Sequence, residues 1–364
     1  MAAAERAERP GDSAAAGRAA DAGTGRLGRD PAAGGDAAMT RGSRQRGIAL
    51  LTAMLVVALA GILAVELLWD LNLELRRTER LLSRDQAREI ALGAEALAAE
   101  LLEQDLEDSP EVDSLDEQWA EEYAFPFEGG SVSGRIEDLQ GRFNLNSLLR
   151  QDGSRDEQAI ERFRRLLRAV ANTVPGDGAN PDNVVDAVLD WMDADQLPEL
   201  GGAEDDVYTN RQPPYRAANY WFTTPTELLA VDGVTPEFFA ALRPLLSALP
   251  PDGGESARAR RINVNTALPE VLRSLSPDIS DTVVEDWIAN RKSQPYADIS
   301  SDFWEGAAQY FPDDANPAEF LDVGSSYYGL SVTVSIGTTR LAMYSLLERS
   351  SQGVIPRLRA FDTD

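Results

Sequence analysis

The sequence has no cysteine, no histidine and only one lysine, Lys292, among its 364 residues. Without cysteine the chain can form no disulfide bond and no thiolate site. Without histidine it lacks the commonest general base and the commonest transition-metal ligand. These absences exclude serine triads that use histidine, zinc sites that use histidine or cysteine, and haem bound through histidine.

Positive charge is also scarce. The formal net charge is −27, from 61 acidic and 34 basic residues. Proteins bind nucleic acids and anionic lipid surfaces by neutralising phosphates, so a body this acidic should repel both. We therefore expect no nucleic-acid partner. Hydrophobic residues make up 43% of the chain, enough to build a buried core.

The N-terminal region changes character twice. Residues 1–38 are mostly alanine, glycine, arginine and aspartate, so we expect disorder there. A short basic segment with three arginines begins at Met39 and precedes an apolar run over residues 48–69. As a helix this run is about 30 Å long, the thickness of a hydrocarbon core. The arginines place its N-terminal end in the cytoplasm and the rest of the chain across the membrane.

Three kinds of N-terminal segment fit this pattern. An uncleaved signal anchor would keep the whole segment. A secretory signal peptide would be cut near Ala58 to Ala60, but the apolar run continues to Leu68, where a cleaved signal should already be polar. A type IV pilin-like leader would be cut after Gly47, so that Ile48 becomes the new N-terminus and the helix stays attached.

The chain turns amphipathic after the apolar run. Over residues 70–108, leucine and isoleucine recur mostly at three-, four- or seven-residue spacings among arginine and glutamate. No proline occurs between Ile48 and Ser109. This pattern predicts one long helix, a membrane-spanning half followed by a stem on a globular domain. A membrane anchor followed by an ordinary surface helix would show the same periodicity.

Strand patterns occur near both ends of the remaining chain. Residues 131–145 alternate apolar and polar side chains, which predicts two strands, and the alternation returns over residues 327–347 with a turn at Gly337. About 170 residues lie between the two segments. We therefore expect an α+β fold, in which one antiparallel sheet, built from residues 109–148 and 322–364, is interrupted by an insert.

The insert, residues 149–321, carries helix signals. Amphipathic spacing and N-terminal proline or threonine predict helices over residues 160–174, 184–192, 237–249, 266–275 and 279–292. Thr224, Pro225 and Glu227 form a capping-box pattern that should start another helix. We expect the insert to be all-α.

Several blocks of this sequence resemble one family, the K-type minor pseudopilins of type II secretion systems (general secretion pathway protein K). The blocks follow in order from Met39 to Ile355. They are the basic leader that ends at Gly47, the helix over residues 48–68, DLQGRFNLN at 138–146, DWMD at 190–193, GAED at 202–205, PPYR at 213–216 and INVNTA at 262–267. Several blocks in order are more specific than any one of them.

The resemblance implies a non-enzymatic assembly subunit. Prepilin peptidase would cut the leader, residues 1–47, between Gly47 and Ile48, and Ile48 would then be N-methylated. The subunit would cross the inner membrane once, contact the inner-membrane secretion platform, and lie at the tip of a periplasmic pseudopilus with minor pseudopilins I and J. There it would help start or cap the pseudopilus that exports folded proteins. The implied fold is a pilin-like helix and sheet with a large helical insert.

The fifth residue after the expected cleavage site is Thr52. Most pilin-like subunits carry glutamate there, thought to pair in lipid with the terminal amine of a neighbouring subunit. Threonine cannot make that ion pair, and an unpaired buried charge is costly, so a subunit without such a neighbour does better without the glutamate. This fits a cap rather than a repeating subunit. Thr52 could also be an ordinary membrane residue.

An acidic loop is the main candidate site. Calcium binds six to eight oxygen ligands in flexible, carboxylate-rich loops. Gly201 and Gly202 let the backbone turn tightly within the loop, whose spacing is not that of an EF-hand. A solvated charge run is the alternative, and the family resemblance includes calcium in this region. The candidate ligands are Asp190, Asp193, Asp195, Glu204, Asp205, Asp206 and Asn219.

Two other functions have partial sequence signals. Residues 231–235 and 262–292 resemble DNA-binding helix-hairpin-helix modules, but the second hairpin has acidic residues and no glycine, so we interpret both as packing elements. A membrane-anchored periplasmic carbohydrate-active enzyme would use paired carboxylates such as Asp205 and Asp206 across a cleft. Nothing in the sequence places two carboxylates in that way.

Overall fold

The computed structural model of the chain describes residues 42–174, 180–251 and 257–362. The predicted disorder of residues 1–38 and most of the predicted leader lie outside these residues. The chain divides into two units, the first ending at Asn72 and the second beginning at Leu73. Each unit is described by itself.

The first unit contains the apolar part of helix α1 (Gly42–Asp108), which is 67 residues long. Its large apolar side chains, from Ile48 to Leu68, are exposed, and its most apolar stretch has a mean hydropathy of 2.8. Among the described residues, α1 is the helix long and apolar enough to cross a membrane. The predicted continuous, proline-free helix to residue 108 is confirmed.

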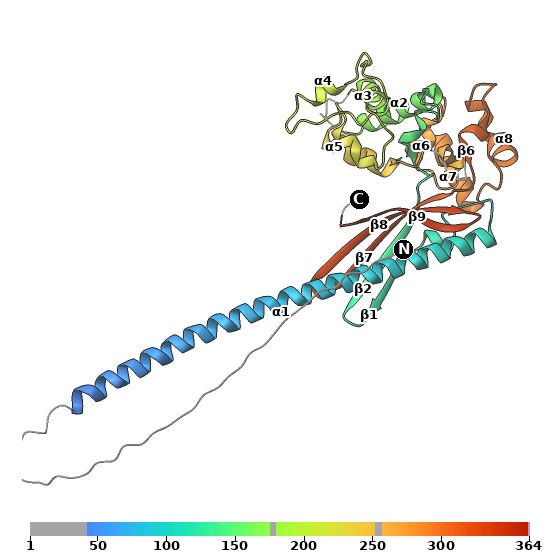
Figure 1. The fold of residues 1–364 in the computed structure, drawn as a ribbon. Helices are drawn as coiled ribbons and strands as arrows, with labels where there is room; N and C mark the ends of the chain where they lie inside the picture. Colours follow the sequence, from blue (N-terminus) through green and yellow to red (C-terminus); the bar gives the residue numbers. More distant parts are fainter. Residues whose placement is uncertain (1–41, 175–179, 252–256, 363–364) are drawn as a thin grey trace, which may run out of the picture. The chain divides into compact units, whose positions relative to one another are not determined.

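The second unit combines the rest of α1 with a five-stranded antiparallel sheet (Figure 1). The strand order is β1-β2-β7-β8-β9. Small side chains of α1, Ala87, Ala91 and Ala98, are buried with apolar side chains of β2, β7 and β8 in one core. Alanine lets the helix backbone approach the sheet closely. The strands are β1 (Glu122–Phe127), β2 (Gly130–Asp138), β7 (Tyr327–Ile336), β8 (Thr339–Ser350) and β9 (Gly353–Phe361).

The insert separates two strands that pair directly. In β2 and β7, Asp138 faces Tyr328 and Gly130 faces Ile336, although the whole helical insert lies between these strands in the sequence. This confirms the α+β fold with an interrupted antiparallel sheet. The two strands predicted over residues 131–145 are instead mainly one, β2, followed by a two-residue strand, β3 (Phe143–Asn144).

The α-helices of the insert form one group beside the sheet (Figure 1). They are α2 (Glu157–Ala171), α3 (Pro181–Met192), α4 (Asp205–Tyr208), α5 (Pro236–Leu242), α6 (Pro269–Ser274), α7 (Asp281–Ser293) and α8 (Trp304–Ala307). Their apolar faces share one core, separate from the core under the sheet. The insert therefore packs as a body of its own.

Short helical turns and strands complete the described chain. The 3₁₀ turns are Gln118–Ala120, Leu145–Ser147, Pro225–Ala230, Arg243–Leu245, Ala257–Arg260, Ala308–Tyr310 and Pro317–Glu319, and a π-turn covers Ile299–Phe303. Two parallel pairs join β3 to β4 (Leu246–Ser247) and β5 (Ile262–Asn263) to β6 (Leu321–Asp322). The insert is thus mainly, but not entirely, helical.

The helix predictions hold with shifted ends. The capping box of Thr224 and Glu227 is present, but it opens a 3₁₀ turn rather than an α-helix. The helix predicted to reach residue 249 ends at Leu242, because Pro244 has no N–H to continue it and the chain turns into β4. The helix predicted from Thr266 begins at Pro269, where proline suits the first helical position.

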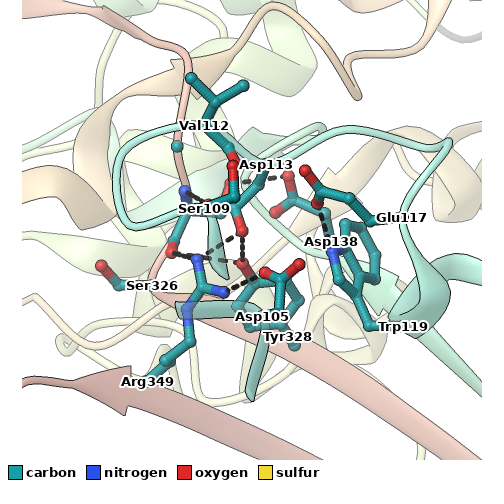
Figure 2. Close-up of polar contacts among 12 residues, drawn as sticks. Asp105, Ser109, Val112, Asp113, Glu117, Trp119, Asp138, Ser326, Tyr328 and Arg349 are labelled. Carbon is teal, nitrogen blue, oxygen red and sulfur yellow. Dashed lines mark hydrogen bonds and ion pairs between the residues drawn. The ribbon is translucent and has the colours of Figure 1, made fainter. Parts of the chain in front are cut away.

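A buried polar cluster ties the end of α1 to the sheet (Figure 2). Arg349 of β8 pairs with Asp113 and, at 2.7 Å, with Asp105 in the last turn of α1. Arg349 is 5% exposed and Asp113 is 1% exposed. Tyr328 donates its hydroxyl to Asp113 at 2.7 Å. The guanidinium of Arg349 therefore joins β8 to the end of α1 and to the loop that follows it.

Asp138, at the end of β2, continues this cluster into the insert. Its Oδ2 accepts hydrogen bonds from Thr266 Oγ1 at 2.5 Å, Ser325 Oγ at 2.6 Å and Asn263 Nδ2 at 3.1 Å. Asn263 and Thr266 belong to the INVNTA block, and Asp138 opens the DLQGRFNLN block. Two of the sequence blocks thus meet in the fold, where they fasten the insert to the sheet.

Candidate cation site in the acidic loop

The acidic loop starts in the last turn of α3. The Asn180 side chain caps the start of this helix by accepting from Asp182 N, and Pro181 takes the first helical position. Asp190 lies near the other end and is fully buried. Asp193 follows the helix and donates its N–H to Leu189 O at 2.9 Å. Carboxylates therefore project from a fixed helix end.

The loop folds back onto Asp190. Glu199 N lies 3.2 and 3.1 Å from the two carboxylate oxygens of Asp190. At Gly202 the backbone passes so close to Asp190 that an added Cβ would overlap its Oδ2. The glycine is needed here for close approach.

Three further carboxylates converge. Oxygens of Asp193, Asp195 and Glu204 all lie within 4.8 Å of one another. Both oxygens of Glu204, and Oδ1 of Asn219, are buried without a hydrogen-bond partner among the described residues. Asn219 N donates to Trp191 O at 2.9 Å, which holds Asn219 beside the end of α3. Buried oxygens left unpaired are costly, and a hard cation would satisfy them.

The carboxylates repel one another in the absence of a cation. Burial, together with the charges of neighbouring aspartates, raises the pKa of Glu204 to about 7. Burial likewise raises the pKa of Asp190 to about 6, against hydrogen bonds from the loop backbone that favour its charged form. The cluster therefore holds more negative charge than its surroundings compensate, which is the chemistry that calcium fits.

Not every predicted ligand belongs to the convergent group. Asp205 accepts from Ala217 N at 3.1 Å and pairs with Arg216 at 3.4 Å. Asp206 is exposed on α4. The carboxylates whose oxygens converge are Asp193, Asp195 and Glu204. Asp190 acts on Glu204 through its charge, and Asn219 keeps a buried oxygen unpaired. This arrangement gives no support to a carbohydrate-active enzyme, because Asp205 and Asp206 do not face each other across a cleft.

Sequence reasoning missed two residues of this site. Arg155 pairs with Glu199 and, at 3.3 Å, with Asp193. It attaches the loop to the segment before α2 and offsets part of the negative charge. Nothing in the spacing points to this pair, since 38 residues separate Arg155 from Asp193.

Two family models match the chain, over residues 141–251 and 262–323, and both are described as type II secretion system (T2SS), protein K. The type II secretion system protein K of Aeromonas hydrophila is 34% identical over 87% of this chain and 96% of its own length. The chain belongs to the type II secretion system protein K family. Members of this family are minor pseudopilins, structural subunits of the secretion system, and so is this chain.

Further comparisons agree with this assignment. The protein K of Pseudomonas aeruginosa is 34% identical over 87% of this chain and 92% of its own length. A chain from the crystal structure of the GspK–GspI–GspJ complex of enterotoxigenic Escherichia coli is 23% identical, with a TM-score of 0.62, over 79% of this chain and 100% of that chain. The likeness confirms the fold. The acidic loop lies inside the first family-model match, so it is part of the K-family domain.

The predicted cleavage site and Thr52 lie in α1. The Gly47–Ile48 bond is within the helix, and the Ile48 side chain is 62% exposed. The Thr52 hydroxyl donates to Ala49 O at 3.0 Å, one turn earlier in the same helix. Its hydrogen-bonding need is therefore met within its own chain.

Proposed function

We propose that this K-family pseudopilin lies at the tip of the periplasmic pseudopilus, where it starts or caps assembly and so helps export folded proteins across the outer membrane. The observation that carries the proposal is the helical insert between β2 and β7. A subunit that repeats along a filament must leave room for neighbours at both ends of its globular domain. An insert of this size takes up one of them, which suits a terminal subunit.

Thr52 supports a terminal position. Its hydroxyl is satisfied by Ala49 O, so it needs no amine from a neighbouring subunit, whereas a lipid-buried glutamate would. Produced alone with the secretion machinery, the chain should form no long filaments. Filaments made mainly of this chain would contradict the proposal.

The partners follow from the same role. The solved relative comes from a complex of GspK, GspI and GspJ, and we propose that this chain assembles with minor pseudopilins I and J of its own system. Prepilin peptidase and the inner-membrane platform would act on it earlier. Co-purification with I and J from detergent tests the assembly, and failure of I and J to be retained would count against it.

We propose that the chain crosses the inner membrane once, with a short cytoplasmic N-terminus and a periplasmic globular domain. The basic segment before the apolar helix supports this orientation. Cleavage between Gly47 and Ile48, with N-methylation of Ile48, predicts a mature sequence that begins Ile-Ala-Leu-Leu-Thr. N-terminal sequencing checks this, and a start at Gly61 would favour a secretory signal peptide instead.

The acidic loop is proposed to bind calcium for a structural purpose. Asp190, Asp193, Asp195, Glu204 and Asn219 would supply oxygens, and the ion would cancel their mutual repulsion. It would fasten the end of α3 to the loop before α4. The role assigned to the cation is to stabilise the insert, and no catalytic step is proposed for this chain.

A further inference from the structure

A small hollow of the insert gathers positive charge, although the chain has a net charge of −27. Four arginines and two carboxylates are among its lining residues. Its volume is about 30 Å³, enough for a carboxylate or a small oxyanion but not for a large organic ligand. We call it the arginine pocket. The charged lining residues are Arg142, Arg162, Arg260, Arg261, Asp156 and Glu319.

Three of the arginines have partners that explain them. Arg142 pairs with Glu137 at 3.0 Å, and Arg261 pairs with Asp322 at 3.2 Å. Arg260 donates to the backbone carbonyls of Leu149 and Ser147 at 2.6 and 2.8 Å. The contacts of Arg260 and Arg261 fasten the segment before β5 to the backbone of Ser147 and Leu149 and to the side chain of Asp322. The three arginines are therefore largely structural.

Arg162 is different. Its guanidinium lies over the Phe320 ring, 3.9 Å from the centroid, and donates to the neutral Gln158 side chain at 3.1 Å. It forms no ion pair with a carboxylate of the described residues, although the charges of Asp156 and Glu319 act on it. The stacked ring holds the guanidinium flat against one wall. Its charge is thus fixed in place and not paired.

Both lining carboxylates have other hydrogen-bond partners. Asp156 caps α2 by accepting from Ala159 N at 3.1 Å. Its other oxygen lies 3.6 Å from Arg260 and 3.8 Å from Arg150. Glu319, the second carboxylate, accepts from Asn316 Nδ2 at 3.2 Å. Neither carboxylate forms an ion pair with Arg162, although the charges of both act on it.

The electrostatics of the arginines agree with this geometry. Burial lowers the pKa of Arg162 to about 10, and burial also lowers the pKa of Arg260. Arg155 and Arg349 are also buried in part, yet carboxylate partners raise their pKa values. The charges of Asp156 and Glu319 act on Arg162, and that of Asp156 acts on Arg260, but they offset the effect of burial only in part.

The pocket adjoins a wider hollow. Arg162 and Phe320 also line a cavity of about 300 Å³ whose walls include Leu275, Pro277 and Phe311. A carboxylate in the arginine pocket could therefore belong to a molecule with an apolar group beside it.

We propose that the arginine pocket binds a single carboxylate or small oxyanion, with Arg162 as the group whose charge the anion neutralises. The planar guanidinium, stacked on Phe320, presents its free N–H groups to the anion, in the geometry that suits two-oxygen recognition. The anion would bridge α2 and the segment before β5.

The test is thermal melting of the full-length chain in detergent with calcium present. Sulfate, acetate and N-acetylleucine are each compared with chloride at equal ionic strength. At about ten times the dissociation constant, a bound anion should raise Tm by roughly 2–4 °C. The sulfate and acetate arms report a free anion, and a larger shift with N-acetylleucine reports a carboxylate that carries an apolar group.

Variants separate binding from the general stabilising effect of sulfate. Arg162→Gln should remove the shift. Arg168→Gln is the matched control, because Arg168 lies on the same helix but pairs with Asp182 at 2.8 Å. If Arg162→Gln does not fold, Arg162→Lys should keep a reduced shift. Equal shifts in wild type and the Arg162 variants, or no saturable heat when the anions are titrated into wild type, would overturn the proposal.

Discussion

At Gly202 one missing methyl group decides whether the acidic loop can close. An added Cβ would overlap Asp190 Oδ2, so Gly202→Ala should push the loop away from α3. We expect a loss of about 2–3 kcal/mol in the free energy of unfolding with calcium present, as for other substitutions that overpack a buried site. Urea unfolding checks this.

The control for this prediction is Gly306→Ala. An added Cβ at Gly306, in α8, meets nothing within 4 Å. Alanine there should leave stability unchanged or raise it by up to about 1 kcal/mol, since glycine weakens helix interiors. An equal loss of stability in both variants would show that Gly202→Ala does not act through the close approach to Asp190.

Substitution of Glu204 should raise Tm without calcium and lower it with calcium. Its two buried oxygens are unpaired, and four neighbouring aspartates repel its charge. Glu204→Gln removes that repulsion and also removes a calcium ligand. Without calcium we therefore expect a higher Tm than wild type, and with calcium a lower one. Asp206→Asn, at an exposed position of α4, is the control and should have the Tm of wild type with and without calcium. If Glu204→Gln also had the Tm of wild type in both conditions, Glu204 would not be a calcium ligand.

Single residues of this site were only partly predictable. The acidic side chains and the paired glycines are visible in the sequence because they lie within 17 residues of one another, from Asp190 to Asp206. Arg155 and Glu199 were not, since their pairing depends on how the segment before α2 meets the loop. Which acids converge also depends on tertiary structure, and Asp206 shows that proximity in sequence does not suffice.

Among the elements, strands whose side chains alternate between buried and partly buried were the easiest to predict. β7 and β8 alternate buried and partly buried side chains along most of their length, which is the period-two pattern of a covered sheet. The edge strands β1 and β9 were missed. Each contains a proline, Pro126 or Pro356, and is largely exposed, so its residues lack the alternation that marks a central strand.

Arg349 of β8 joins parts of the fold that are not linked to β8 by the backbone hydrogen bonds of the sheet. It pairs with Asp105 of α1 and with Asp113 of the following loop, and both it and Asp113 are buried. Arg349→Met would leave two carboxylates without their cation in a site closed to water. We expect a loss of about 3–5 kcal/mol in the free energy of unfolding, as for other broken buried pairs. Arg135→Met, which removes an exposed ion pair with Glu137, should cost less than about 1 kcal/mol.

The same cluster should make stability depend on pH. Burial raises the pKa of Asp105 to about 7, and the charges of Glu117 and Asp113 act in the same direction, because one guanidinium cannot neutralise all three carboxylates. A carboxyl with a raised pKa binds its proton more tightly in the folded chain. Its contribution to stability is therefore complete below its ordinary pKa of 3.8 and is lost as the pH rises through 7.

Asp105→Asn tests this dependence. The variant cannot ionise, so relative to wild type its free energy of unfolding should increase between pH 5 and pH 8, by about 1 kcal/mol or more. Saturating calcium keeps the acidic loop from titrating in the same range. A constant difference between variant and wild type across these pH values would show that Asp105 does not titrate there.

For the whole molecule, the net charge of −27 makes cations the natural stabilisers. A nonspecific effect of that charge would be the same for any divalent ion at equal concentration. A built site distinguishes ions, because calcium accepts six to eight oxygens in flexible geometry, whereas magnesium demands a tighter octahedron and keeps its waters. The proposal of a built site rests on the unpaired oxygens of Glu204, which lie close to oxygens of Asp193 and Asp195.

Calcium should therefore stabilise the protein more than magnesium does. After chelator treatment, calcium at about a hundred times its dissociation constant should add roughly 2.7 kcal/mol to the free energy of unfolding, because it binds only the folded loop. For a domain of this size, Tm should rise by about 2–4 °C or more. Magnesium should give a smaller rise, and Glu204→Gln should reduce the calcium response to the magnesium level. Equal responses to the two ions, or none, would mean that the acidic loop is a solvated surface whose charge is screened by any cation.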